Sequence, residues 1–159
     1  MEFTTIILVL FAILHIPFLG RLKGLETRID KASVAMGIAF LVPGVMHFTD
    51  PSPFMLIIPR QIPWHLQLVY VSGVFEILGG LGLMLRFSRK FSGIGLALML
   101  LAVFPANINA AVSHIKIPGL PTGDWYYWTR LPWQLLYIAW ALWCSGVLKK
   151  TSPKNNLKK

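Results

Sequence analysis

Five apolar stretches, separated by short polar connections, constrain this 159-residue chain more than any other feature. They cover approximately residues 3–20, 32–49, 67–85, 91–113 and 125–148. A helix of about 20 apolar residues crosses a hydrocarbon core of about 30 Å. The stretches therefore predict an all-α, polytopic membrane protein whose chain crosses the lipid bilayer five times.

The Lys and Arg residues are distributed unevenly over the connections. If the connections alternate sides, twelve of the fifteen fall on one side: Arg21, Lys23, Arg28, Lys31, Arg86, Arg89, Lys90, Lys149, Lys150, Lys154, Lys158 and Lys159. The other side receives Arg60, Lys116 and Arg130. Because cytoplasmic connections carry the excess of Lys and Arg, we expect a multi-pass protein of the cytoplasmic (inner) membrane, with its N-terminus outside and its C-terminus in the cytoplasm.

The same charges account for the net charge of +9. They lie in short caps between apolar stretches and form no basic recognition helix, so we expect no nucleic-acid partner. The first stretch has Glu2 before it and Arg21 after it, the reverse of a cleavable signal peptide, which predicts a retained helix. Cys144 is the single cysteine and can form neither an internal disulfide nor a redox pair, so it is expected to be a packing residue.

Prolines and small residues indicate how the helices pack. Residues 50–66 contain four prolines among apolar side chains, which predicts a re-entrant or interfacial segment at the outer mouth rather than a sixth crossing. Pro43 and Pro105 lie inside two stretches, where paired kinks could open a cavity or only shape the packing. Small residues at helical spacing predict close contacts of the second, third and fourth stretches: Ala32, Ala35, Ala39, Gly44, Gly73, Gly79, Gly80, Gly82, Ala102, Ala106 and Ala110.

Polar side chains within the apolar stretches are the functional candidates, because ionisable groups are costly inside a bilayer. Glu76 lies about 15 Å below the outer start of its stretch, at a rise of about 1.5 Å per residue. The sequence predicts that the outer half holds seven candidate ligand-binding residues: Glu76, Arg130, His47, Asn107, Gln134, His114 and Tyr137. Asn107 and His114 are seven residues apart and share a helix face, as do Arg130, Gln134 and Tyr137.

Arg130 is the only cation of fixed charge near Glu76, so we expect these two residues to form a direct ion pair. Two interpretations of the cluster stay open: it is a ligand-binding or proton-handling site, or it only fixes the register of the helices. We expect no metal site, because His47, Asp50, His65 and His114 lack a ligand-type spacing. Catalytic residues cannot be assigned from the sequence.

Four short motifs resemble the DoxX-like family of small bacterial integral membrane proteins: Gly44–Phe48, Glu76 with Gly79–Leu83, Pro105–Asn107 and Thr129–Gln134. The resemblance implies a four-helix transmembrane bundle over residues 31–148. An extra N-terminal transmembrane helix and a basic loop, residues 1–30, precede it, and a basic cytoplasmic tail, residues 149–159, follows.

The DoxX-like family takes its name from a subunit linked to thiosulfate–quinone oxidoreduction. The resemblance therefore implies a connection to membrane redox chemistry, although the chain has no redox motif of its own and its being an enzyme stays open. We expect no covalently bound cofactor, and a quinone or a redox partner protein would have to carry electrons. The leading hypothesis is binding of a hydrophobic small molecule, a quinone or a lipid, in an outer-half pocket. The alternatives are a non-catalytic accessory subunit of a redox enzyme and a transporter of a small solute or protons.

Overall fold

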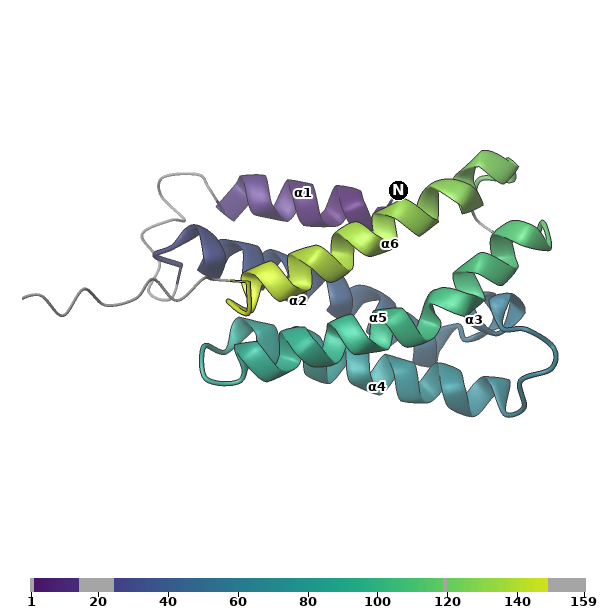
Figure 1. Ribbon diagram of the computed structural model, residues 1–159, viewed down its shortest axis with the longest axis horizontal. Helices are drawn as coiled ribbons and strands as arrows, with labels where there is room; N and C mark the ends of the chain where they lie inside the picture. The colour runs from purple at the N-terminus through teal and green to yellow at the C-terminus, as the bar shows by residue number, and fades with distance from the viewer. Residues whose placement is uncertain (1, 15–24, 119, 149–159) are drawn as a thin grey trace, which may run out of the picture.

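The computed structural model describes residues 2–14, 25–118 and 120–148, and all regular structure in these ranges is helical (Figure 1). This confirms the predicted all-α class. The helices are α1 (Glu2–Leu14), α2 (Arg28–Thr49), α3 (Ser52–Ile57), α4 (His65–Met84), α5 (Arg89–Val112) and α6 (Asp124–Cys144).

Three of these helices are long and apolar enough to cross a membrane. They are α2, α4 and α5, with 22, 20 and 24 residues and mean hydropathies of 1.6, 1.6 and 1.9. The described part of the first predicted stretch is the 13-residue α1, and the remainder of that stretch lies outside the described residues. α6 has 21 residues but is not among these three helices. Five of its first ten residues are Trp or Tyr.

The start of α2 lies four residues before the predicted stretch because of a capping box. The Thr27 hydroxyl accepts a hydrogen bond from the Asp30 backbone N–H, and the Asp30 carboxylate accepts one from the Thr27 N–H. Two backbone donors that a helix start leaves without partners are thereby satisfied. The apolar pattern alone could not reveal this polar first turn.

The four long helices α2, α4, α5 and α6 run alongside one another, and α1 lies against α2 (Figure 1). α2 packs most extensively against α4, while α5 packs against both α4 and α6. Their shared core lies toward the end where α2 begins and α6 ends. Its buried members include Met36, Phe40, Leu83, Leu96 and Cys144, so Cys144 is a packing residue as predicted.

Glycines allow α2 and α4 to approach closely. A methyl group added at Gly80 would lie 2.7 Å from the Gly37 carbonyl oxygen, and one added at Gly73 would lie 2.7 Å from the His47 Cβ. A real side chain could occupy neither position unless the backbones moved apart. The predicted small-residue contact of the second and third stretches is therefore confirmed.

An ion cluster, in which Asp30 and Arg89 are buried, joins the start of α2 to the turn between α4 and α5. Arg89 donates a hydrogen bond of 2.8 Å to the Asp30 carboxylate and one of 3.0 Å to the Leu83 carbonyl oxygen. Arg86 binds both Asp30 and Glu26. From the sequence, Arg86 and Arg89 were expected only to flank an apolar stretch, and their pairing with Asp30, which is 3% exposed, was not predicted.

Close contacts of α5 also lie toward this end of the molecule. A methyl group on Gly79 or Gly82 would strike Leu96 or Ser92 of α5, and one on Gly93 would strike Ser145 after α6. Toward the opposite end, α5 and α4 diverge (Figure 1). The helices are therefore closed at one end and spread apart at the other.

Residues 50–64 connect α2 to α4 at the open end of the molecule (Figure 1). Their only helix, α3, has six residues and is too short to cross a bilayer. Its Ile57 is buried against Ala110, Ala111 and Tyr127, so the segment covers the end of the helix group.

Substitution of Gly80 by alanine tests the α2–α4 contact. The new methyl group would meet backbone, which cannot rotate away, so the free energy of unfolding should fall by about 1–3 kcal/mol. Gly95→Ala in α5 is the matched control, because nothing lies within 4 Å of its new methyl group. Thermal unfolding of the purified protein in detergent measures the stability of both variants. Equal stability of Gly80→Ala and Gly95→Ala would show that α2 and α4 do not approach so closely at Gly80.

Candidate functional site

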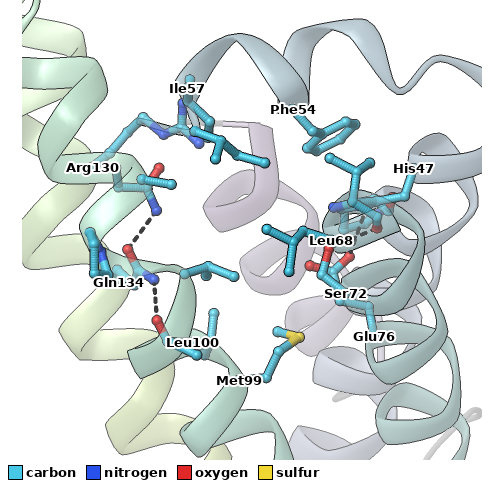
Figure 2. A pocket seen from close by; sticks show the side chains of 18 of the residues that line it. His47, Phe54, Ile57, Leu68, Ser72, Glu76, Met99, Leu100, Arg130 and Gln134 are labelled. Carbon is cyan, nitrogen blue, oxygen red and sulfur yellow. Dashed lines mark hydrogen bonds and ion pairs between the residues drawn. The ribbon is translucent and has the colours of Figure 1, made fainter. Parts of the chain in front are cut away.

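A cavity of about 790 Å³ lies between the spread ends of α2, α4, α5 and α6, beneath residues 54–62. Most of its lining is apolar and includes Phe75, Met99 and Trp133. Pro43 and Pro105 both contribute to the wall, which favours the interpretation that the two prolines open a cavity. Figure 2 shows that its polar side chains gather on two opposite walls.

The first polar wall consists of His47 on α2 and Glu76 on α4. The His47 Nδ1 atom lies 2.6 Å from the Pro43 carbonyl oxygen. A carbonyl oxygen can only accept a hydrogen bond, so Nδ1 carries a proton. The Glu76 Oε2 atom lies 3.5 Å from the same nitrogen but is buried without a hydrogen bond from any described residue.

The ring of Phe54 on α3 stacks on the imidazole ring of His47. The two rings are stacked with centroids 3.8 Å apart and an interplanar angle of 24°. Gly73 of α4 lies directly beside the His47 Cβ, so no side chain on α4 separates the imidazole from Glu76. Phe54 could not be predicted from the sequence as part of the site, because its contact with His47 depends on the path of residues 50–64.

The second polar wall consists of Asn107 on α5 with Arg130 and Gln134 on α6. Asn107 donates a 2.6 Å hydrogen bond to Gln134, which donates one of 2.6 Å to the Leu100 carbonyl oxygen (Figure 2). The Asn107 Oδ1 and Arg130 Nη1 atoms are buried without a hydrogen-bond partner among the described residues. Tyr137 lines the same cavity one turn beyond Gln134.

The predicted direct ion pair between Glu76 and Arg130 is wrong. The two side chains lie on opposite walls, with Glu76 against His47 and the Arg130 guanidinium directed toward Ile57 (Figure 2). α4 packs against α2 and α5, whereas α6 packs against α5 and α2, so the two residues belong to helices on opposite sides of the group. The sequence predicted that the two residues lie at similar positions along their helices, but it could not predict the order of the helices around the cavity.

His114 does not belong to the cavity. α5 ends at Val112, and His114 has a positive φ of 49°, which turns the chain away from the helix. Its Nδ1 atom lies 3.0 Å from the Asp124 carboxylate, and both side chains are exposed. The predicted shared face of Asn107 and His114 is therefore wrong, because it required the helix to continue.

Two further features of α5 lie at the cavity. Ala102 and Ala106 of the predicted alanine stripe line the cavity. Ala110 is buried in the cluster with Ile57 and Tyr127, so the stripe both provides space and packs against neighbouring elements. Asn109, which the sequence analysis missed, donates a 2.9 Å hydrogen bond to the Ile57 carbonyl oxygen and attaches α3 to α5. Among the described residues, no three His, Cys, Asp or Glu side chains are grouped as metal ligands.

Residues 36–145 match the family model described as "Domain of unknown function (DUF8561)". The chain belongs to this family. The matched region contains every residue that lines the cavity, from Phe40 to Tyr137. No curated protein and no solved structure gives a significant match.

The separation of the two walls predicts the outcome of a double-mutant cycle. Glu76→Gln and Arg130→Gln share no interaction partner, so their effects on the free energy of unfolding should add to within about 0.5 kcal/mol in the ligand-free protein. Unfolding of the two single variants and the double variant in detergent provides the measurement. A double variant that recovers most of the loss would instead show that the two residues are paired.

Proposed function

We propose that this protein is an integral membrane protein that binds a hydrophobic small molecule, such as a quinone or a lipid, in the cavity beneath residues 54–62. One observation carries the proposal: an apolar cavity of about 790 Å³ has unpartnered, buried polar atoms on two opposite walls. A cavity of this size with a few converging polar groups is typical of small-molecule sites.

The unpartnered atoms are the Glu76 Oε2, Asn107 Oδ1 and Arg130 Nη1 atoms. A buried polar atom without a hydrogen bond costs about 1–3 kcal/mol, and more if it is charged. A bound molecule whose polar groups pair with these atoms would remove that cost, while its apolar part would contact Phe75, Met99 and neighbouring side chains. We therefore assign ligand binding to Glu76, Arg130, Asn107, Gln134, His47 and Tyr137.

We further propose that α2, α4, α5 and α6 form a four-helix transmembrane bundle and that α1 belongs to an additional crossing. The charge distribution supports an outside N-terminus and a cytoplasmic C-terminus, since Arg60, Lys116 and Arg130 all lie toward the open end of the helix group. The cavity would then open in the outer half of the cytoplasmic membrane. The DoxX-like motifs Gly44–Phe48 and Pro105–Asn107 contribute residues to the cavity, which suits the hypothesis of a quinone ligand.

Blocking the cavity tests the proposed binding. Ala102 lines the cavity, so Ala102→Phe should fill it, and the variant should lose most of a hydrophobic molecule that the parent retains on purification. Ala139→Phe is the control, because Ala139 is exposed on α6 and does not line the cavity. Mass spectrometry of solvent extracts measures the retained molecule.

Equal amounts of that molecule in the parent and in Ala102→Phe would contradict the proposal. A parent that carries no small molecule but retains a redox protein would instead favour the accessory-subunit hypothesis.

A reporter fused after Lys159 tests the orientation. The twelve-to-three division of Lys and Arg predicts activity of a reporter that works only in the cytoplasm. A second fusion before residue 1 should be active only with an exported reporter. Activity of an exported reporter at the C-terminus would refute the orientation and would place the cavity in the inner half.

A further inference from the structure

Arg130 is a cation without an anion. Its side chain lines the cavity, and none of the hydrogen bonds or ion pairs among the described residues involves its guanidinium. An arginine stays protonated in proteins, so it cannot lose its charge when it is buried. Arg130 is partly exposed as a whole, but its Nη1 atom is buried and has no hydrogen-bond partner among the described residues. A buried donor on a charged group is costly when it is left without an acceptor, and the cost is higher within a bilayer.

The described carboxylates that form ion pairs have other partners. Asp30 and Glu26 bind the arginines at the closed end, Asp124 lies beside His114, and Glu76 lies beside His47 on the opposite wall. The wall around Arg130 instead offers the amides of Asn107 and Gln134, which bind each other. The protein therefore supplies positive charge on this wall without a matching negative charge.

The apolar lining continues from this wall to the outside of the helix group. Leu68 and Phe75 on α4 and Leu98 on α5 line the cavity, yet all three are more than a third exposed. An acyl chain that starts near Arg130 could follow this surface and leave between the two helices, where a bilayer would place lipid chains.

We infer that the ligand is a single-chain amphiphile with an acidic headgroup, whose carboxylate or phosphate binds the Arg130 guanidinium while its hydrocarbon chain lies in the apolar cavity. This inference rests on the proposed function and names its ligand class. The headgroup lies below Ile57, toward which Arg130 is directed, so residues 54–62 cover it (Figure 2). The planar guanidinium donates two parallel hydrogen bonds to either kind of acid.

Three ligands with the same oleyl chain test the inference: oleic acid, oleyl phosphate and the uncharged oleyl alcohol. Binding of the tritiated acid and the tritiated alcohol to the immobilised full-length protein in neutral detergent is measured by scintillation proximity, and the phosphate is measured by its competition with the tritiated acid. We expect the acid to bind about 10- to 100-fold more tightly than the alcohol, as befits a charge-assisted hydrogen bond. Tighter binding of the phosphate would indicate a phospholipid-derived ligand, and tighter binding of the acid would indicate a fatty acid.

Two substitutions of Arg130 and one control locate the charge that is recognised. Arg130→Gln should abolish the preference for the acid, and Arg130→Lys, which keeps the charge, should retain part of it. Arg60→Gln should leave the preference unchanged, because Arg60 is exposed and outside the cavity. If Arg130→Gln does not fold, the preference of Arg130→Lys for the acid over the alcohol still tests the role of Arg130.

Equal affinity of the parent for acid and alcohol would overturn the inference, as would a preference that survives in Arg130→Gln. In both cases saturable binding of the chain would still support a hydrophobic ligand. If neither ligand binds saturably to the parent, the inference is wrong, and the comparison of the parent with Ala102→Phe decides the proposed function separately.

Discussion

The close contact between α2 and α4 determines much of the candidate site. Within lipid, burial of apolar side chains contributes little to helix association, so contacts between small residues become important. Gly37, Gly73 and Gly80 provide such contacts, and Gly73 leaves room for His47 beside Glu76. A larger residue at any of these glycines would separate the imidazole from the carboxyl group, even though none of them carries a functional group.

The two ends of the helix group then differ for a physical reason. At the closed end, Asp30 and Arg89 are both buried and are bound to each other, and removal of Asp30 would leave the Arg89 guanidinium buried without an anion. Glycines bring α4, α5 and the end of α6 together at the same end. At the other end Pro43 and Pro105 lie in the wall, and small residues such as Ala102 and Ala106 leave space that no side chain of the protein fills.

The sequence predicted the all-helical class and one region for Glu76, Arg130, His47, Asn107, Gln134 and Tyr137, because polar side chains within apolar helices are costly unless they meet other polar groups. It could not predict which helix lies beside which, so it paired Glu76 with Arg130 instead of with His47. Periodicity also cannot locate a helix end that a positive φ produces, which explains the error at His114. The Asp30 cluster was missed because its arginines resemble the ordinary cationic flanks of a transmembrane helix.

The arrangement of hydrogen bonds weighs against a purely structural role for the polar cluster. A device that fixes helix register needs contacts between helices, and two such contacts are present: His47 with Glu76 joins α2 to α4, and Asn107 with Gln134 joins α5 to α6. Each contact stays within its own wall. The Arg130 Nη1 and Asn107 Oδ1 atoms take no part in either contact, and the Glu76 Oε2 atom lies 3.5 Å from the His47 Nδ1 atom without a hydrogen bond. All three atoms are costly where they are. An amphiphilic ligand needs such unpartnered polar atoms beside an apolar cavity. These atoms therefore favour a ligand site, whereas the hydrogen-bonded groups of the two walls do not distinguish a ligand site from a structural one.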